Sequence, residues 1–160
     1  MAHYLKDDFK AGQIAECIAA NQPWKIKCFQ RIPTGKYNVT YSVELDGGAI
    51  EAPEEAILRI APPDDTGGAF YEIGMMAQEP EIHDIVRQHT SIPAAKIYTH
   101  DTSRRVIDRD FLIMEKLPGR PLSQVGGRTM DFHNRVLEQV GAMLGELHRL
   151  TRTRYGYLGA

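Results

Sequence analysis

The sequence predicts an α+β fold: a five-stranded antiparallel sheet with a helix between its third and fourth strands, then a hinge and a long amphipathic helix. Three patterns lead to this prediction. Apolar and polar residues alternate with a period of two through residues 36–45, four apolar residues fill 111–114, and an apolar stripe with a helical period runs through 130–149. The first two patterns are typical of strands, and the third is typical of a helix that buries one face.

A short helix is expected first, over residues 8–20, because Ile14 and Ile18 lie four residues apart and can share one buried face. Asp7 or Asp8 could cap its first turn, since a carboxylate there accepts a hydrogen bond from a free backbone N–H group. The Asn-Gln-Pro sequence that follows is expected to end the helix.

Five strands are expected after this helix. In the run 36–45 the odd-numbered residues are apolar or aromatic and the even-numbered ones polar, as in a strand with one buried face. Asp46-Gly47-Gly48 then supplies a tight reversal, because glycine accepts positive φ at little cost. The expected strands are residues 36–45, a segment from about Ala49, residues 56–61, residues 96–100 and residues 111–115.

Two further helices complete the prediction. The first begins or kinks near Pro80 and ends before Thr90. Pro118, which has no N–H donor, and Gly119 end the last strand and form a hinge. The second helix follows, and its apolar stripe consists of Val136, Leu137, Val140, Met143, Leu144, Leu147 and Leu150.

Composition excludes several classes of function. The 160 residues carry a formal charge of −2, which does not suit a protein that binds a nucleic-acid backbone. No apolar run reaches the roughly 20 residues needed to cross a bilayer. The two cysteines form no disulfide framework, so we expect reduced thiols and a cytoplasmic location. The six histidines show no metal-binding spacing, and no metal site is expected in this chain.

Several segments match, in order, motifs that occur together in one family. They are GKYNVTY at 35–41, ILRI at 57–60, TSIP at 90–93, FLIMEKLPG at 111–119 and LGELHRL at 144–150. Together they resemble the aminoglycoside phosphotransferase and choline kinase-like family, which has a protein-kinase-like fold. The resemblance covers nearly the whole chain after Lys25, and the helical segment at 1–24 precedes it. It implies a kinase-like amino-terminal lobe at 25–117, and the hinge with the start of an incomplete helical lobe at 118–160.

The resemblance gives Arg59 the role of the third-strand cation that holds the α- and β-phosphates of ATP. A guanidinium can grip a phosphate with two parallel hydrogen bonds, which a lysine cannot do. Glu79 matches the helix carboxylate that aims this cation, with Glu81 as a rival two positions further on. Without the resemblance, a strand arginine is more simply a solvated edge residue.

The resemblance also implies contacts from the main chain. The Glu115 carbonyl and the Leu117 amide would bind the edge of adenine, and Met114 would lie beside the base. Gly35 and Asn38 belong to the turn that covers the nucleotide. Asn38 has an alternative role, because a turn asparagine often bonds its own backbone.

Residues 151–160 contain neither the catalytic-loop aspartate nor the magnesium ligands that the family uses. We therefore expect no catalytic residue in this chain, Mg²⁺ binding only together with the missing lobe, and no phosphoryl transfer by this polypeptide alone. The chain could be a fragment, a truncated gene product or one piece of a longer polypeptide. The small-molecule acceptor is not indicated by any residue present.

Three functions follow from these observations. The leading hypothesis is the ATP-binding part of a small-molecule phosphotransferase, which transfers the γ-phosphate of ATP to a hydroxyl acceptor when the catalytic lobe is present. The alternative is a non-catalytic, pseudokinase-like module with a binding or scaffold role. A third hypothesis, an unrelated α+β binding protein, is favoured if Arg59 proves exposed and distant from Leu117.

The long helix generates the first prediction. Each large aliphatic side chain left in water forgoes about 1.5–3 kcal/mol of burial free energy. We therefore predict self-association at high concentration unless this helix docks internally. Light scattering should report species larger than the monomer, and a clean monomer would count against the prediction. The contact residues would be Val136, Val140, Met143, Leu144 and Leu147.

Overall fold

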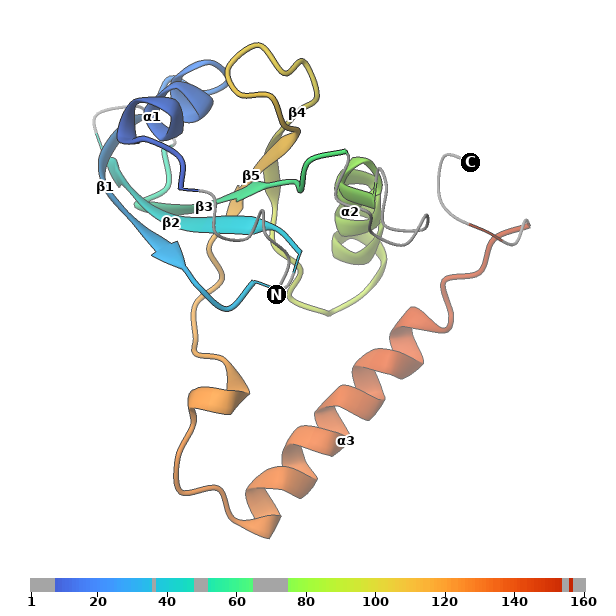
Figure 1. The fold of residues 1–160 in the computed structure, drawn as a ribbon. Coiled ribbons are helices and arrows are strands. Elements are labelled where there is room, and N and C mark those ends of the chain that lie inside the picture. Colours follow the sequence, from blue (N-terminus) through green and yellow to red (C-terminus); the bar gives the residue numbers. More distant parts are fainter. Residues whose placement is uncertain (1–7, 36, 48–51, 65–74, 154–155, 157–160) are drawn as a thin grey trace.

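The computed structural model describes residues 8–35, 37–47, 52–64, 75–153 and 156. It confirms the predicted α+β class, with one antiparallel five-stranded sheet among these residues (Figure 1). The strands are β1 (Lys25–Ile32), β2 (Val39–Asp46), β3 (Glu55–Ile60), β4 (Ile97–Asp101) and β5 (Phe111–Glu115). The helices are α1 (Ala11–Ala19), α2 (Glu79–His89) and α3 (Met130–Leu147), with 3₁₀ turns at Met75–Gln78 and Leu122–Gln124.

The sheet differs from the prediction in two ways. Its first strand is β1, which the sequence pattern did not reveal, and β2 pairs directly with β3. The strand expected from about Ala49 begins outside the described residues, and residues 52–54 are not part of a strand. The strand order is β1-β2-β3-β5-β4, so β5 lies between β3 and β4 although it comes last in the sequence.

Irregular pairing occurs only at the two edges of the sheet. The β1–β2 register shifts between Ile26 and Cys28, and the β4–β5 register shifts between Ile97 and Thr99. The ladders β2–β3 and β3–β5 run without a shift. The centre of the sheet is therefore regular, and the interruptions of the ladder are confined to its outer strands, β1 and β4.

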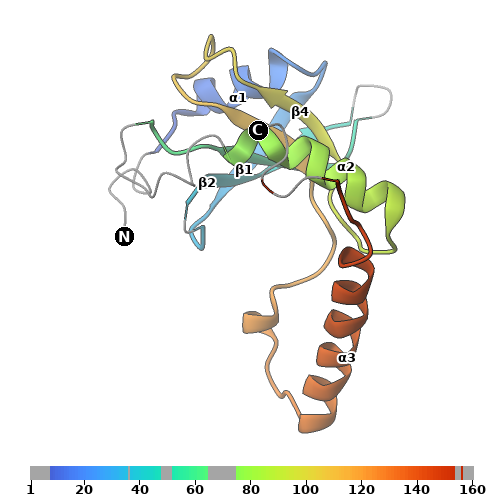
Figure 2. The same ribbon diagram turned by 90° about the vertical axis from the view of Figure 1, so that its right-hand side faces the viewer.

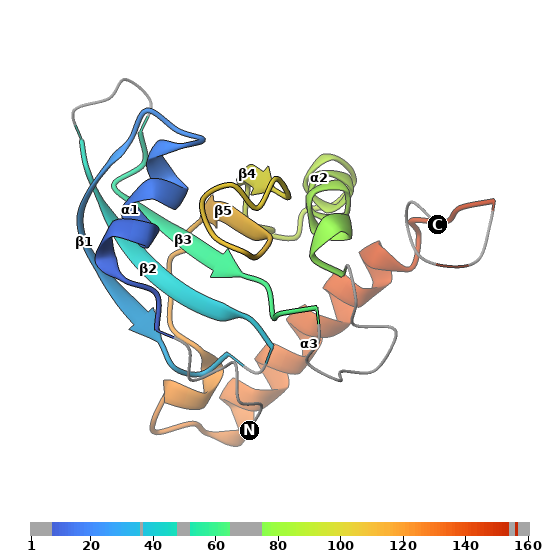
Figure 3. The same ribbon diagram turned by 45° about the horizontal axis from the view of Figure 1, so that its top comes forward.

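Helix α1 covers one face of the sheet and closes the main core (Figure 3). Its residues Ile14, Cys17 and Ile18 are fully buried. The alternation predicted for β2 is confirmed, because its odd-numbered side chains from Val39 onward point into this core. Tyr37 is the exception, since it precedes the strand and is exposed. The same core takes Ala56, Leu58 and Ile60 from β3 and Phe111 and Ile113 from β5.

The start of α1 is not capped as predicted. Asp7 lies outside the described residues. Asp8 precedes the helix and instead accepts a hydrogen bond of 2.9 Å from Arg31 Nη1 on β1. The Gln13 side chain accepts the Lys10 N–H at 3.0 Å, which satisfies one of the free donors at the helix start.

Helix α3 runs away from the sheet (Figure 2). It begins where the sequence predicts, with Thr129 Oγ1 accepting the Phe132 N–H at 3.2 Å. None of its residues is buried, and Leu137 is 67% exposed. The stripe therefore does not dock onto the sheet, and self-association stays a prediction. No helix among the described residues is long and apolar enough to span a membrane.

The two cysteines should differ sharply in reactivity. Burial raises the pKa of the Cys17 thiol to about 12, whereas Cys28 is exposed on β1 and its pKa is raised by a hydrogen bond with Glu44. Because the thiolate is the reactive form, we expect a thiol reagent at pH 8 to modify Cys28 alone in the native protein and both residues in urea. Peptide mass spectrometry can measure the extent of modification of each cysteine, with Cys28→Ser as the control. Modification of native Cys17 at the rate of Cys28 would contradict the core described above.

Candidate functional site

The strand register places Arg59 on the face of the sheet opposite α1. Directly opposite residues in an antiparallel ladder share a face, and Arg59 pairs with Thr40 on β2 and with Leu112 on β5. One row further on, Ile57 pairs with Met114. Arg59 and Met114 therefore point to the same side of the sheet from adjacent strands.

A close ion pair links this face to α2. Arg59 Nη1 donates to Glu79 Oε2 at 2.5 Å. The side chains are only 26% and 21% exposed, so the pair is sheltered from water. Glu79 is the first residue of α2, where the helix dipole favours a carboxylate. A guanidinium has five N–H donors, and no other hydrogen bond of Arg59 occurs among the described residues.

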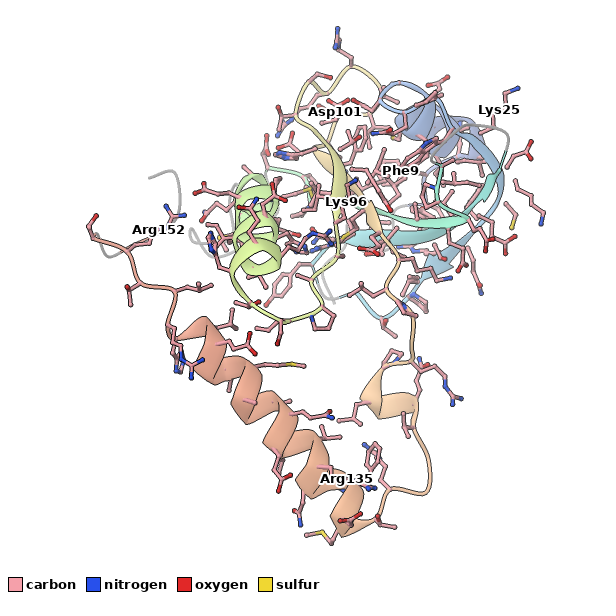
Figure 4. All side chains as sticks on the ribbon, turned by 180° about the vertical axis from the view of Figure 1, so that it is seen from behind. Phe9, Lys25, Lys96, Asp101, Arg135 and Arg152 are labelled. Atoms are coloured by element: carbon pink, nitrogen blue, oxygen red, sulfur yellow. The ribbon has the colours of Figure 1, made fainter. Side chains whose placement is uncertain are left out.

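The structure shows which of the two helix glutamates pairs with Arg59. Glu79 faces Arg59, and Glu81 instead accepts a hydrogen bond of 2.9 Å from Arg152 Nη2, beyond α3. Figure 4 shows Arg152 close to α2, while Arg135 lies at the far end of α3. The helix therefore offers two carboxylates to two different cations.

The end of β5 is fixed by hydrogen bonds from both its backbone and a side chain. The Glu115 N–H donates to the Lys96 carbonyl at 2.8 Å, and the Glu115 carboxylate accepts the Lys96 N–H at 2.9 Å. Arg87 of α2 donates to the same carboxylate at 3.4 Å. Only main-chain groups of Glu115 were expected to matter, so the structural role of its side chain is an addition to the prediction.

After Glu115 the chain leaves the sheet. Met114 is buried, whereas Leu117 is 41% exposed, and its N–H has no backbone hydrogen-bond partner among the described residues. Gly119 has φ of +125°, a conformation that favours glycine. This segment can therefore offer backbone groups to a ligand.

The turn before β2 is compact at the position of Gly35. A Cβ atom on Gly35 would lie 2.6 Å from the Asn38 carbonyl oxygen, closer than real Cβ contacts come. Lys36 lies outside the described residues. Thr40 is opposite Arg59 in the register, so this turn stands at the Arg59 end of the sheet.

Sequence reasoning did not identify three residues on the same face. They are Thr40 and Ser42 of β2 and Leu112 of β5. Only the pairing of strands brings them beside Arg59, so their local sequence carries no signal of it. Within the part of the chain that the structure describes, no group of three or more metal-ligating side chains could hold an ion.

The sheet with its helix between β3 and β4, and a cation on β3 paired with a glutamate of that helix, define the amino-terminal lobe of a protein-kinase-like fold. A sequence model of the phosphotransferase enzyme family matches residues 29–157. The chain therefore belongs to the phosphotransferase enzyme family, and the resemblance found in the sequence is confirmed. No curated protein gives a significant match.

A solved structure shares the fold. It is a crystal structure from Ralstonia eutropha JMP134 that its authors call a "putative aminoglycoside phosphotransferase". The TM-score is 0.58 at 17% sequence identity, and the match covers 88% of this chain. Our chain spans only 38% of that protein, so this likeness concerns the fold of its matched part alone.

The compact turn generates a prediction of its own. Gly35→Ala must push the Asn38 carbonyl away, so we expect it to lower the free energy of unfolding by about 1–3 kcal/mol. Gly12→Ala is the matched control, because Gly12 lies in α1 with nothing within 4 Å of the new Cβ atom. There the gain in helix propensity should stabilise the protein by up to about 1 kcal/mol. Urea denaturation measures both, and equal effects would show that the turn is not compact.

Proposed function

We propose that this chain is the ATP-binding part of a small-molecule phosphotransferase, and that the whole protein transfers the γ-phosphate of ATP to a hydroxyl acceptor. The observation that carries the proposal is the Arg59–Glu79 ion pair on the same face of the sheet as Met114. The third-strand cation thus shares a face of the sheet with Met114, which directly precedes the hinge, and this supports a nucleotide bound across that face. Arg59 is partly sheltered, so the reading of it as a solvated edge residue loses its support.

The residues present suit the two ends of ATP. Arg59 keeps several N–H donors beyond the one used by Glu79 and could grip the α- and β-phosphates. Adenine has a donor and an acceptor along one edge, which complement a backbone carbonyl and an amide such as those of Glu115 and Leu117. Met114 and Ile57 would supply an apolar surface for the flat base.

Phosphoryl transfer depends mainly on positioning and on electrostatic stabilisation of phosphate oxygens. ATP supplies the phosphoryl group when it is bound, and this chain would contribute the grip on the phosphates. Glu79 would hold the Arg59 guanidinium in place before the nucleotide arrives, which reduces the freedom lost on binding. Residues of the remaining protein would have to bring Mg²⁺, the catalytic aspartate and the acceptor.

The proposal is tested by comparing two ligands that differ only in their phosphates. Isothermal titration calorimetry should show that the chain binds ATP more tightly than adenosine. Arg59→Ala should weaken ATP binding about tenfold or more, because a charge-assisted hydrogen bond is worth about 1.5–3 kcal/mol. Adenosine binding should change less than about twofold, because adenosine lacks the phosphates that Arg59 would hold.

Arg135→Ala is the matched control, since Arg135 lies on α3 and pairs only with the exposed Asp131 in the part of the chain that the structure describes. ATP affinity should not change in this variant. If wild-type protein binds neither ligand, or if both arginine variants weaken ATP equally, the proposal fails.

A further inference from the structure

Helix α2 carries Glu79, and no side chain of this helix is fully buried. Its half-buried side chains include the apolar Ile85 and Val86, and polar side chains add hydrogen bonds to the segment beside it. His83 Nδ1 lies 2.7 Å from the Ala95 carbonyl, and Arg87 donates to the Ala94 carbonyl at 3.0 Å. A helix without a fully buried side chain depends on such hydrogen bonds more than an element locked into a close-packed core does.

The tightest of these polar anchors comes from α3. The Ser91 N–H donates to Glu146 Oε2 at 2.6 Å, and the Ser91 hydroxyl donates to Glu146 Oε1 at 2.7 Å. Both carboxylate oxygens are thus used by one residue, in the turn that directly follows α2. The partners are 55 residues apart in the sequence, so this contact fixes α2 against the helix beyond the hinge.

The turn that holds Ser91 is itself tied to α2. Thr90 ends the helix, and both its N–H and its hydroxyl bond to the Val86 carbonyl, at 3.0 and 2.6 Å. The Ile92 N–H then donates back to Thr90 Oγ1 at 3.2 Å. Because of these bonds, a shift of Ser91 should move the end of α2 with it.

Electrostatics makes the position of Glu146 unusual. It lies in the last turn of α3 and just beyond the last turn of α2, and the carboxyl-terminal end of a helix dipole repels an anion. Hydrogen bonds from the Ser91 hydroxyl and amide nevertheless lower the pKa of the Glu146 carboxyl. The carboxylate is therefore charged at neutral pH, and its two bonds from Ser91 are charge-assisted.

We propose that Glu146 is a positioning residue: by holding Ser91 it sets the position of α2, and α2 in turn presents Glu79 to Arg59. This inference rests on the proposed function for its effect on nucleotide binding. Through this connection α3 acts on the phosphate end of the site without touching it. Loosening the contact should weaken the grip on phosphates and spare the adenine end.

The test uses Glu146→Ala and Ser91→Ala. Glu138→Ala is the control, since Glu138 is exposed on the same helix and makes no hydrogen bond or ion pair among the described residues. By calorimetry, Glu146→Ala and Ser91→Ala should weaken ATP binding about fivefold or more and adenosine binding less than about twofold. Glu138→Ala should change neither. An equal loss for both ligands would indicate a general structural role and would overturn the inference.

A double-mutant cycle tests the route of the effect. If Glu146 acts through Glu79, then Glu146→Ala should have no further effect on ATP binding in a Glu79→Gln background. If the two losses simply multiply, Glu146 acts by another route and the inference is wrong.

Hydrogen exchange separates this inference from the proposed function, because it needs no nucleotide. Amides of α2 should lose protection in Glu146→Ala and Ser91→Ala but not in Glu138→Ala, while β3 and β5 keep theirs. Unchanged α2 protection would overturn the inference even if ATP binds. If wild-type protein binds no ATP but α2 loses protection as expected, the proposed function fails and the anchoring of α2 by Glu146 stands.

Discussion

The ion pair between Arg59 and Glu79 connects the two parts of this molecule that differ most in how they are held together. Arg59 belongs to β3, the middle strand of a regular sheet whose other face is closed by α1. Glu79 begins a helix with no buried residue. Because the guanidinium is fixed to the rigid part, the position of the carboxylate determines how the remaining donors of Arg59 are directed.

The two faces of the sheet have correspondingly different chemistry. The face under α1 is packed with Ile14, Ile18, Leu58 and their neighbours, and no polar residue described in the structure is fully buried there. The face that carries Arg59 also has Thr40 and Ser42, and its covering helix is held by side-chain hydrogen bonds. One face of the sheet is therefore a close-packed apolar core, and the other is a more polar surface.

The sequence allowed those elements to be predicted whose cause is local. The alternation in β2, the apolar run of β5 and the stripe of α3 each reflect a period within a single segment. Strand β1 escaped detection because it lies at an edge and most of its side chains are exposed, so no alternation marks it. No local sequence pattern indicates that β5 lies between β3 and β4.

In the candidate site, too, some features could be predicted from local sequence and others could not. Resemblance led to Arg59 and Glu79, but the choice between Glu79 and Glu81 depended on contacts between distant segments. Glu79 pairs with Arg59, and Glu81 pairs with Arg152, 71 residues beyond it. The hydrogen bond between Ser91 and Glu146 could not be predicted from the sequence either. Both residues lie in recognisable motifs, but nothing in those motifs indicates that the two side chains are in contact. Roles that arise from contacts between distant segments become visible only in the folded structure.

The bulges at the two rims of the sheet have a consequence for how this lobe behaves among copies of itself. A strand from another molecule could not pair evenly with either edge of the sheet. The register shifts at Ile26–Cys28 and at Ile97–Thr99 interrupt the regular spacing of backbone donors and acceptors there. Lys25 and Lys27 add positive charge along one of these borders. The lobe is thereby guarded against the sideways stacking that leads to fibrils.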